Sequence, residues 1–141
     1  MTKNVLISIA GLRYDATEED VVEVISRGEY YYKNGKHYAI YDEVSEELPN
    51  IPTKCIMKMA SNKIEIIKNG ESNVHMVFEI NQSNYTCYTT PFGELMLGIR
   101  TQSISIEEST DQITINLRYQ LDINYEYASD CDLKIKITEK N

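Results

Sequence analysis

Residues 113–127 read ITINLRYQLDINYEY, a stretch in which apolar and polar side chains alternate at every position. This period of two is that of a β-strand, because a helix would spread the apolar side chains around its whole circumference. Fourteen steps of about 3.3 Å make a strand of roughly 46 Å, which is longer than a flat sheet in a small domain needs. We therefore expect this strand to coil strongly or to contain a bulge, as strands of barrels and curved sheets do.

The rest of the chain divides into shorter segments of the same kind. Asn34-Gly35 is typical of a two-residue type I′ hairpin turn, and the polar segment 128–132 is expected to join strand 113–127 to the alternating segment 133–138. About ten short antiparallel strands follow, a number that favours a sandwich or a barrel. The segments expected as strands are 5–9, 30–33, 36–43, 53–59, 64–68, 74–80, 85–90, 94–106, 113–127 and 133–138.

The composition agrees with this pattern. Of the 141 residues, 18 are Ile and 11 are Tyr, side chains that suit a pleated, half-buried surface. The length predicts one domain over residues 1–141. A net charge of −8 argues against nucleic acid or an anionic membrane as the main partner. No apolar run is long enough for a membrane-spanning helix, and three scattered cysteines do not make a disulfide framework, so we expect a cytoplasmic protein.

Residues 18–27 leave strand and helix open. The acidic residues of segment 15–20 and the glycine at position 28 are compatible with the start and end of a helix. Four branched side chains within five residues, at positions 21, 22, 24 and 25, favour a strand. We predict a strand here.

Three stretches taken together resemble a known family. They are GEYYYKNGKHYAIYDE at 28–43, TPFGELMLGIRT at 90–101 and ITINLRYQL at 113–121, and they are similar to the YwiB-like family of uncharacterised bacterial proteins. The resemblance extends over nearly the whole chain. It implies an all-β fold, a single antiparallel calycin-like (lipocalin-like) β-barrel of about 8–10 strands. That family has no established activity, so the resemblance implies a fold and no catalytic residues.

The Tyr-rich hairpin 28–43 is the first candidate site. With a two-residue turn at Asn34-Gly35, the pairs on one face are Tyr32–His37, Tyr30–Ala39 and Gly28–Tyr41. Tyr30, Tyr32 and Tyr41 are therefore candidate ligand-binding residues, whose rings would form a pocket wall and whose hydroxyls would orient a ligand. The alternative interpretation is ordinary core packing.

Arg100 and Glu94 complete the candidate set. The apolar positions of segment 95–99 and those of segment 104–106 differ in parity, which predicts a bulge within 98–103. An Arg100 that shares its face with segment 104–106 would point inward and need an anion, either Glu94 or the head group of a ligand. The alternative is a solvated Arg100 on the surface.

Histidine and cysteine give no metal or catalytic motif. His37 and His75 lie in different hairpins, and no HxH, HxxxH or CxxC spacing occurs. By phase, Cys55 and Cys87 are expected to be buried, His75 to face solvent, and Cys131 to be exposed in a turn. GxSxG, HExxH and phosphate-binding glycine loops are missing from the sequence. We therefore expect no metal, no cofactor and no catalytic residues.

Three functions remain as hypotheses. The first is a non-catalytic intracellular β-barrel that binds a small, partly apolar or anionic molecule. The second is a protein-interaction module with a solid barrel core, which uses the exposed face of the Tyr-rich hairpin. The third is an enzyme, which no motif supports.

Overall fold

The computed structural model describes residues 4–11, 23–43, 52–70, 73–90 and 93–140, and these form ten β-strands in one antiparallel sheet. The strands are β1 (Asn4–Ala10), β2 (Glu23–Lys33), β3 (Lys36–Glu43), β4 (Thr53–Ala60), β5 (Lys63–Asn69), β6 (Val74–Glu79), β7 (Ser83–Thr90), β8 (Gly93–Glu108), β9 (Gln112–Ile123) and β10 (Glu126–Glu139). The expected all-β, antiparallel fold is confirmed. None of the residues described forms an apolar helix long enough to cross a bilayer.

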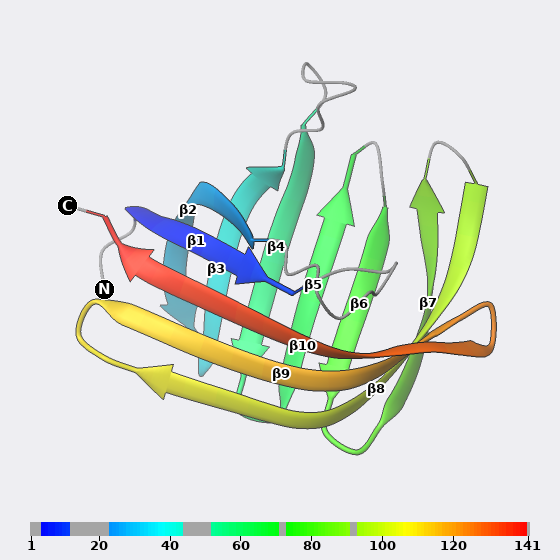
Figure 1. The fold of residues 1–141 in the computed structure, drawn as a ribbon. Helices are drawn as coiled ribbons and strands as arrows, with labels where there is room; N and C mark the ends of the chain where they lie inside the picture. Colours follow the sequence, from blue (N-terminus) through cyan, green and yellow to red (C-terminus); the bar gives the residue numbers. More distant parts are fainter. Residues whose placement is uncertain (1–3, 12–22, 44–51, 71–72, 91–92, 141) are drawn as a thin grey trace.

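The sheet rolls into a nearly closed barrel. Its strand order is β6-β5-β4-β3-β2-β1-β10-β9-β8-β7, so β1 pairs with both β2 and β10. In Figure 1, β1, β10, β9 and β8 run across the front, and β3 to β7 stand behind them. The two edge strands β6 and β7 meet where Asn73 and Thr89 exchange a pair of 2.9 Å backbone hydrogen bonds. Each strand thus lies beside its neighbour in sequence, an arrangement compatible with the calycin-like fold that the resemblance implies.

The interior is packed with large side chains. Phe78 and Tyr119 contact each other edge to face, with ring centroids 5.0 Å apart, and both are almost fully buried. Along strands such as β5 and β9, buried side chains alternate with more exposed ones, as the period of two predicts. Other fully buried large side chains are Ile7, Met57, Met59, Ile64, Ile66, Met76, Leu97, Ile99, Ile115 and Leu121.

Most local predictions hold. Asn34 and Gly35 have φ of 54° and 77°, as a type I′ turn requires, and the register of β2 with β3 gives the expected cross-strand pairs. The predicted irregularity in β8 lies between Thr101 and Ser103. Of the segment 18–27, residues 23–27 belong to strand β2, and the remainder lies outside the described residues.

The predicted strand 113–127 is wrong in its last part. Strand β9 ends at Ile123, and the chain turns at Asn124 and Tyr125, with φ of 52° and 68°. The segment 128–132, expected to be the turn, lies within β10 instead. The true turn is held by β8, because the Asn124 N–H donates to the Met96 carbonyl at 2.7 Å and the Met96 N–H donates to Asn124 Oδ1 at 3.0 Å.

Replacing Tyr125 with glycine is expected to stabilise the protein. Tyr125 adopts a left-handed conformation that costs a non-glycine residue about 1–2 kcal/mol. Its 73% exposed ring contacts only the exposed Tyr85 ring, at 5.9 Å between centroids, among the contacts described. We expect the free energy of unfolding, measured by urea denaturation, to rise by roughly 0.5–1 kcal/mol in Tyr125→Gly.

The first hairpin supplies the matched control. Gly35 occupies the equivalent position of its turn, and a Cβ there would meet no atom within 4 Å. Gly35→Ala should therefore show only the backbone penalty and lose about 1 kcal/mol. A loss of stability in both variants would contradict the interpretation of the Tyr125 turn.

Candidate functional site

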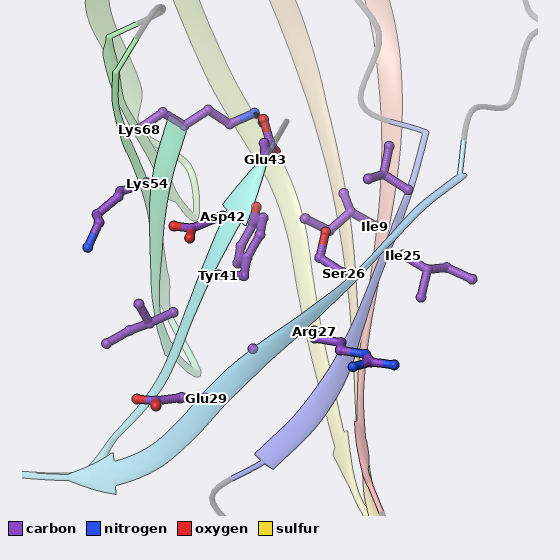
Figure 2. A pocket seen from close by; sticks show the side chains of 13 residues that line it. Ile9, Ile25, Ser26, Arg27, Glu29, Tyr41, Asp42, Glu43, Lys54 and Lys68 are labelled. Carbon is purple, nitrogen blue, oxygen red and sulfur yellow. Dashed lines mark hydrogen bonds and ion pairs between the residues drawn. The ribbon is translucent and has the colours of Figure 1, made fainter. Parts of the chain in front are cut away.

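Strands β2 and β3 separate at one end of the barrel and leave a cleft between them. Their pairing ends at Gly28 and Tyr41. Beyond this point β2 continues along β1, while Asp42 and Glu43 pair with Lys54 and Thr53 of β4. The opening has a volume of about 950 Å³, well above the roughly 300 Å³ at which small-molecule pockets begin. Figure 2 shows the two strands diverging from this fork.

Gly28 sets the shape of the fork. A Cβ at this position would lie 2.5 Å from Ile7 Cδ1 and 2.6 Å from the Ile40 carbonyl oxygen. Any side chain here would push against the core and the neighbouring strand. Glycine therefore lets Ile7 and the Cβ of Tyr41 pack against the backbone at the point where the strands part.

A row of polar side chains crosses the interior beside the cleft. Tyr41 pairs with Cys55, and Cys55 with Lys68, so these inward-facing residues of three strands lie at one level. Above them, toward the end of the barrel, stand Glu43 and its partner Thr53. Below them the core is apolar, beginning with Ala39, Met57 and Ile66. The cleft thus opens onto a layer of polar side chains, and the interior of the barrel below this layer is apolar.

Tyr41 has a hydroxyl without a partner. The residue is only 3% exposed, and its oxygen is buried without a hydrogen bond of normal geometry, although the Cys55 thiol and the Glu43 carboxylate lie near enough to interact with it. Burial, reinforced by these two neighbours, raises the pKa of Tyr41 far above its ordinary value. The hydroxyl is therefore protonated at neutral pH, and a donor in this position is free to bind a polar group that enters the cleft.

Lys68 forms an ion pair with Glu43, which stands one level nearer the end of the barrel. The Lys68 ammonium donates to both Glu43 carboxylate oxygens, at 3.0 and 3.2 Å. The lysine side chain is 10% exposed and the glutamate side chain 31%. A charged group buried this deeply needs an ionic partner, and Glu43 supplies it.

Cys55 is an inert member of the row. Burial, followed by the nearby Glu43 carboxylate, raises the pKa of Cys55 to about 12. The thiol donates to the Thr53 carbonyl at 3.7 Å. A thiol with such a pKa is not a thiolate nucleophile at neutral pH.

The facing wall of the cleft, formed by β1 and β2, combines apolar and polar residues. Ile9 and Ser26 lie across from Tyr41, Glu43 and Lys68 in Figure 2. Val24 and Ile25, which also line the cleft, are 45% and 63% exposed. The two walls therefore offer different chemistry: the apolar Ile9 and Val24 beside the Ser26 hydroxyl on the β1–β2 side, and a phenol with an ion pair on the β3–β5 side.

Of the predicted site residues, only Tyr41 lines this cleft. Tyr30 is buried in β2, two residues beyond Gly28 toward the hairpin turn, and Tyr32, nearer this turn, is 61% exposed. The structure therefore keeps the three tyrosines on one face, as predicted, but separates them in depth. Tyr32 instead packs its ring against His37, at 5.0 Å between centroids.

Tyr30 belongs to a second polar group, around His37. Its hydroxyl lies 2.7 Å from His37 Nδ1, and His37 Nε2 lies 2.6 Å from Glu108 Oε1. In the neutral tautomer with a proton on Nε2, Tyr30 donates to Nδ1 and Nε2–H donates to Glu108. Burial and the Glu108 charge raise the pKa of Tyr30. Because both ring nitrogens are engaged, this group ties the β2–β3 hairpin to the end of β8.

Arg100 and Glu94 lie on the outer surface, so of the two alternatives for Arg100 the inward one is wrong and the solvated one is confirmed. Both side chains are exposed, and Arg100 Nε donates to Ser83 Oγ at 3.2 Å. The reason is the position of the bulge, which follows Thr101. Residues before the bulge keep the phase of Leu97 and Ile99, which point inward, so Arg100 points outward.

Two cysteine predictions are reversed, and one histidine prediction holds. Cys87 is exposed on edge strand β7, whereas Cys131 is buried within β10. His75 is exposed, as expected, and lies 3.1 Å from Glu65. Across the described ranges, no three His, Cys, Asp or Glu residues are grouped as metal ligands.

Lys68 and Glu43 were missed by sequence reasoning, although a signal existed. Lys68 follows Ile64 and Ile66 in phase, and Glu43 follows Ala39 and Tyr41. A charged residue that continues the apolar phase of a strand predicts an inward-pointing charge, which needs a partner. Two such residues in neighbouring hairpins would have indicated the ion pair.

Comparison with known proteins supports the fold and agrees with the resemblance seen in the sequence. The chain is 27% identical over 112 residues to "Uncharacterized beta-barrel protein YwiB" of Bacillus subtilis (strain 168), which covers 79% of this chain and 77% of that protein. The crystal structure of the ywiB protein from Bacillus subtilis matches with a TM-score of 0.82 at 22% identity, covering 99% of this chain and 93% of that one. Residues 7–135 match the family described as "Domain of unknown function (DUF1934)". The chain therefore belongs to the DUF1934 family, and its relative YwiB is an uncharacterised β-barrel protein.

Proposed function

We propose that this protein is a non-catalytic binder of a small, partly apolar molecule, and that the cleft between β2 and β3 is its binding site. The observation that carries the proposal is the buried, unpartnered hydroxyl of Tyr41 beside a 950 Å³ opening. Leaving such a hydroxyl without a partner costs about 1–3 kcal/mol, a cost that a bound polar group would remove.

The apolar residues of the facing wall support the same proposal. The exposed Val24 and the buried Ile9 would cover a hydrocarbon portion of the ligand, while Tyr41 would orient its polar end. The proposal is non-catalytic because the nearest thiol, Cys55, has its pKa raised to about 12 and His37 uses both ring nitrogens.

Binding is tested with 1-octanol and octanoate, two probes that share one apolar chain, by isothermal titration calorimetry. We expect saturable binding of at least one probe. Ser26→Phe, which fills the cleft, should weaken that binding at least ten-fold. Tyr41→Phe should weaken it too, yet raise the free energy of unfolding by about 1 kcal/mol, because it deletes an unsatisfied buried group.

Tyr85→Phe is the matched control, because Tyr85 is an exposed tyrosine on the outer face of β7. It should change neither binding nor stability. Saturation by neither probe, or unchanged binding in the folded Ser26→Phe variant, would overturn the proposal.

One observation favours a second candidate, a protein-interaction surface on the outer face of the β2–β3 hairpin. Tyr31 and Tyr38 stack there with centroids 4.9 Å apart and planes 7° apart, and Tyr31 is 40% exposed. Tyrosine is favoured in such contacts. A Tyr31→Ala variant should then lose self-association or partner binding in light scattering; a wild-type protein that stays monomeric and captures no partner through this face would exclude the candidate.

A further inference from the structure

The Lys68–Glu43 pair joins two residues that differ in their freedom to move. Lys68 lies in β5 between Cys55 of β4 and Val74 of β6, so both sides of its strand are occupied. Glu43 is the last residue of β3, beyond the point where β3 has lost its pairing with β2. The cation is therefore fixed in the row, whereas the carboxylate stands at the edge of the cleft and can turn toward water.

Glu43 also leaves the site incompletely satisfied. Both of its oxygens accept from Lys68 Nζ, at 3.0 and 3.2 Å, but the Tyr41 hydroxyl stays without a hydrogen bond. An anion with two oxygens placed between Lys68 and Tyr41 could accept from both donors at once. It would keep the charge pairing and add the missing hydrogen bond.

The other charged residues that line the cleft do not compete for this position. Arg27, Glu29, Asp42 and Lys54 point away from the Tyr41 hydroxyl in Figure 2. Lys68 is thus the cation that a ligand head group would meet in the polar row, and Glu43 is the anion that the head group would displace.

We propose that the ligand of this cleft carries an anionic head group that displaces Glu43 from Lys68 and accepts a hydrogen bond from Tyr41, while its apolar portion lies along Ile9 and Val24. The inference rests on the proposed binding cleft and adds the charge of the ligand and the mode of its entry. Glu43 acts as an internal stand-in for the anion. It keeps the buried ammonium paired while the cleft is empty.

The test compares octanoate with 1-octanol, because the two probes differ in the head group alone. In the wild-type protein we expect octanoate to bind at least ten-fold more tightly than octanol. Glu43→Gln removes the competing carboxylate, so the ratio of octanoate to octanol affinity should rise about ten-fold further. Lys68→Met should bring the ratio close to one. Acetate, which lacks the chain, should bind far more weakly than octanoate.

Stability of the variants is controlled by a double replacement. The variant with both Glu43→Gln and Lys68→Met tests the same ratio in a neutral site that has no unpaired charge, and a ratio near one supports the proposal. Equal binding of octanol and octanoate by the wild-type protein would overturn the anion exchange and leave the binding cleft standing. A Glu43→Gln variant that binds octanoate less well would also overturn it. Failure of both probes to bind would instead remove the proposed function.

Discussion

Replacing Phe78 with alanine is expected to lower the free energy of unfolding by about 3–5 kcal/mol. Phe78 is fully buried and its ring meets that of Tyr119 edge to face, at 5.0 Å and 70°. Truncation removes the apolar surface that folding buries and leaves a cavity that the stiff β-sheet around it cannot collapse to fill. It also loses the aromatic contact.

Chemical denaturation followed by circular dichroism would measure this loss. Phe78→Leu is the matched variant, because it keeps an apolar side chain and should lose less than about 1.5 kcal/mol. If the slope of the free energy of unfolding against denaturant concentration is unchanged, the substitution alters stability and not the compactness of the denatured state. A loss below about 1 kcal/mol for Phe78→Ala would mean that the interior is far looser than the structure indicates.

Replacing Glu43 with alanine is expected to cost about 3 kcal/mol, at the low end of the range for breaking a buried ion pair. The variant leaves the Lys68 ammonium, whose side chain is 10% exposed, without its carboxylate. Lys68→Met should cost much less. It leaves the charge on Glu43, which is one-third exposed at the cleft and can turn to solvent.

The difference in stability loss between Glu43→Ala and Lys68→Met is checked by a double-mutant cycle, measured by denaturant unfolding. Adding Lys68→Met to Glu43→Ala should recover most of the lost stability, because it removes the unpaired cation. Asp132→Ala, which breaks the exposed Arg118–Asp132 pair of 2.9 Å, should barely change stability. Equal losses for the two single variants, with no recovery in the double variant, would contradict the assignment of Lys68 as the fixed, buried partner.

Sequence reasoning predicted the features of the fold that depend on neighbouring residues. The Asn34-Gly35 turn fixed the β2–β3 register, because only a few residue pairs allow two successive left-handed conformations. It failed at Tyr125, where a tyrosine occupies the position that glycine usually takes. A two-residue turn exchanges odd and even positions among the inward-facing side chains, as it does between β2 and β3, but the bulge between Tyr127 and Ser129 moves those of β10 back to odd positions. The apolar alternation therefore continues from β9 into β10 without a visible stop.

The candidate site was harder to predict because a long-range feature creates it. Tyr41 was found from the register of its hairpin, but the cleft exists because β2 and β3 stop pairing at Gly28, which no local pattern indicates. The direction of Arg100 stayed open in the sequence because it depends on where the bulge lies, and the structure has the bulge between Thr101 and Ser103, beyond Arg100. A shift of a single residue in a bulge reverses the face of every side chain before or after it.

The strand order of the barrel also has a consequence for how the chain folds. Eight of its nine strand pairings join consecutive strands, and the ninth joins β1 to β10, where the Lys140 N–H donates to the Asn4 carbonyl at 3.1 Å. Local hairpins need little loop-closure entropy, whereas the last pairing must bring together residues 5–10 and 134–139, which are far apart in the sequence. The largest loss of chain entropy during folding therefore accompanies the pairing of β1 with β10. The paired residues of these two strands are separated by more of the sequence than those of any hairpin.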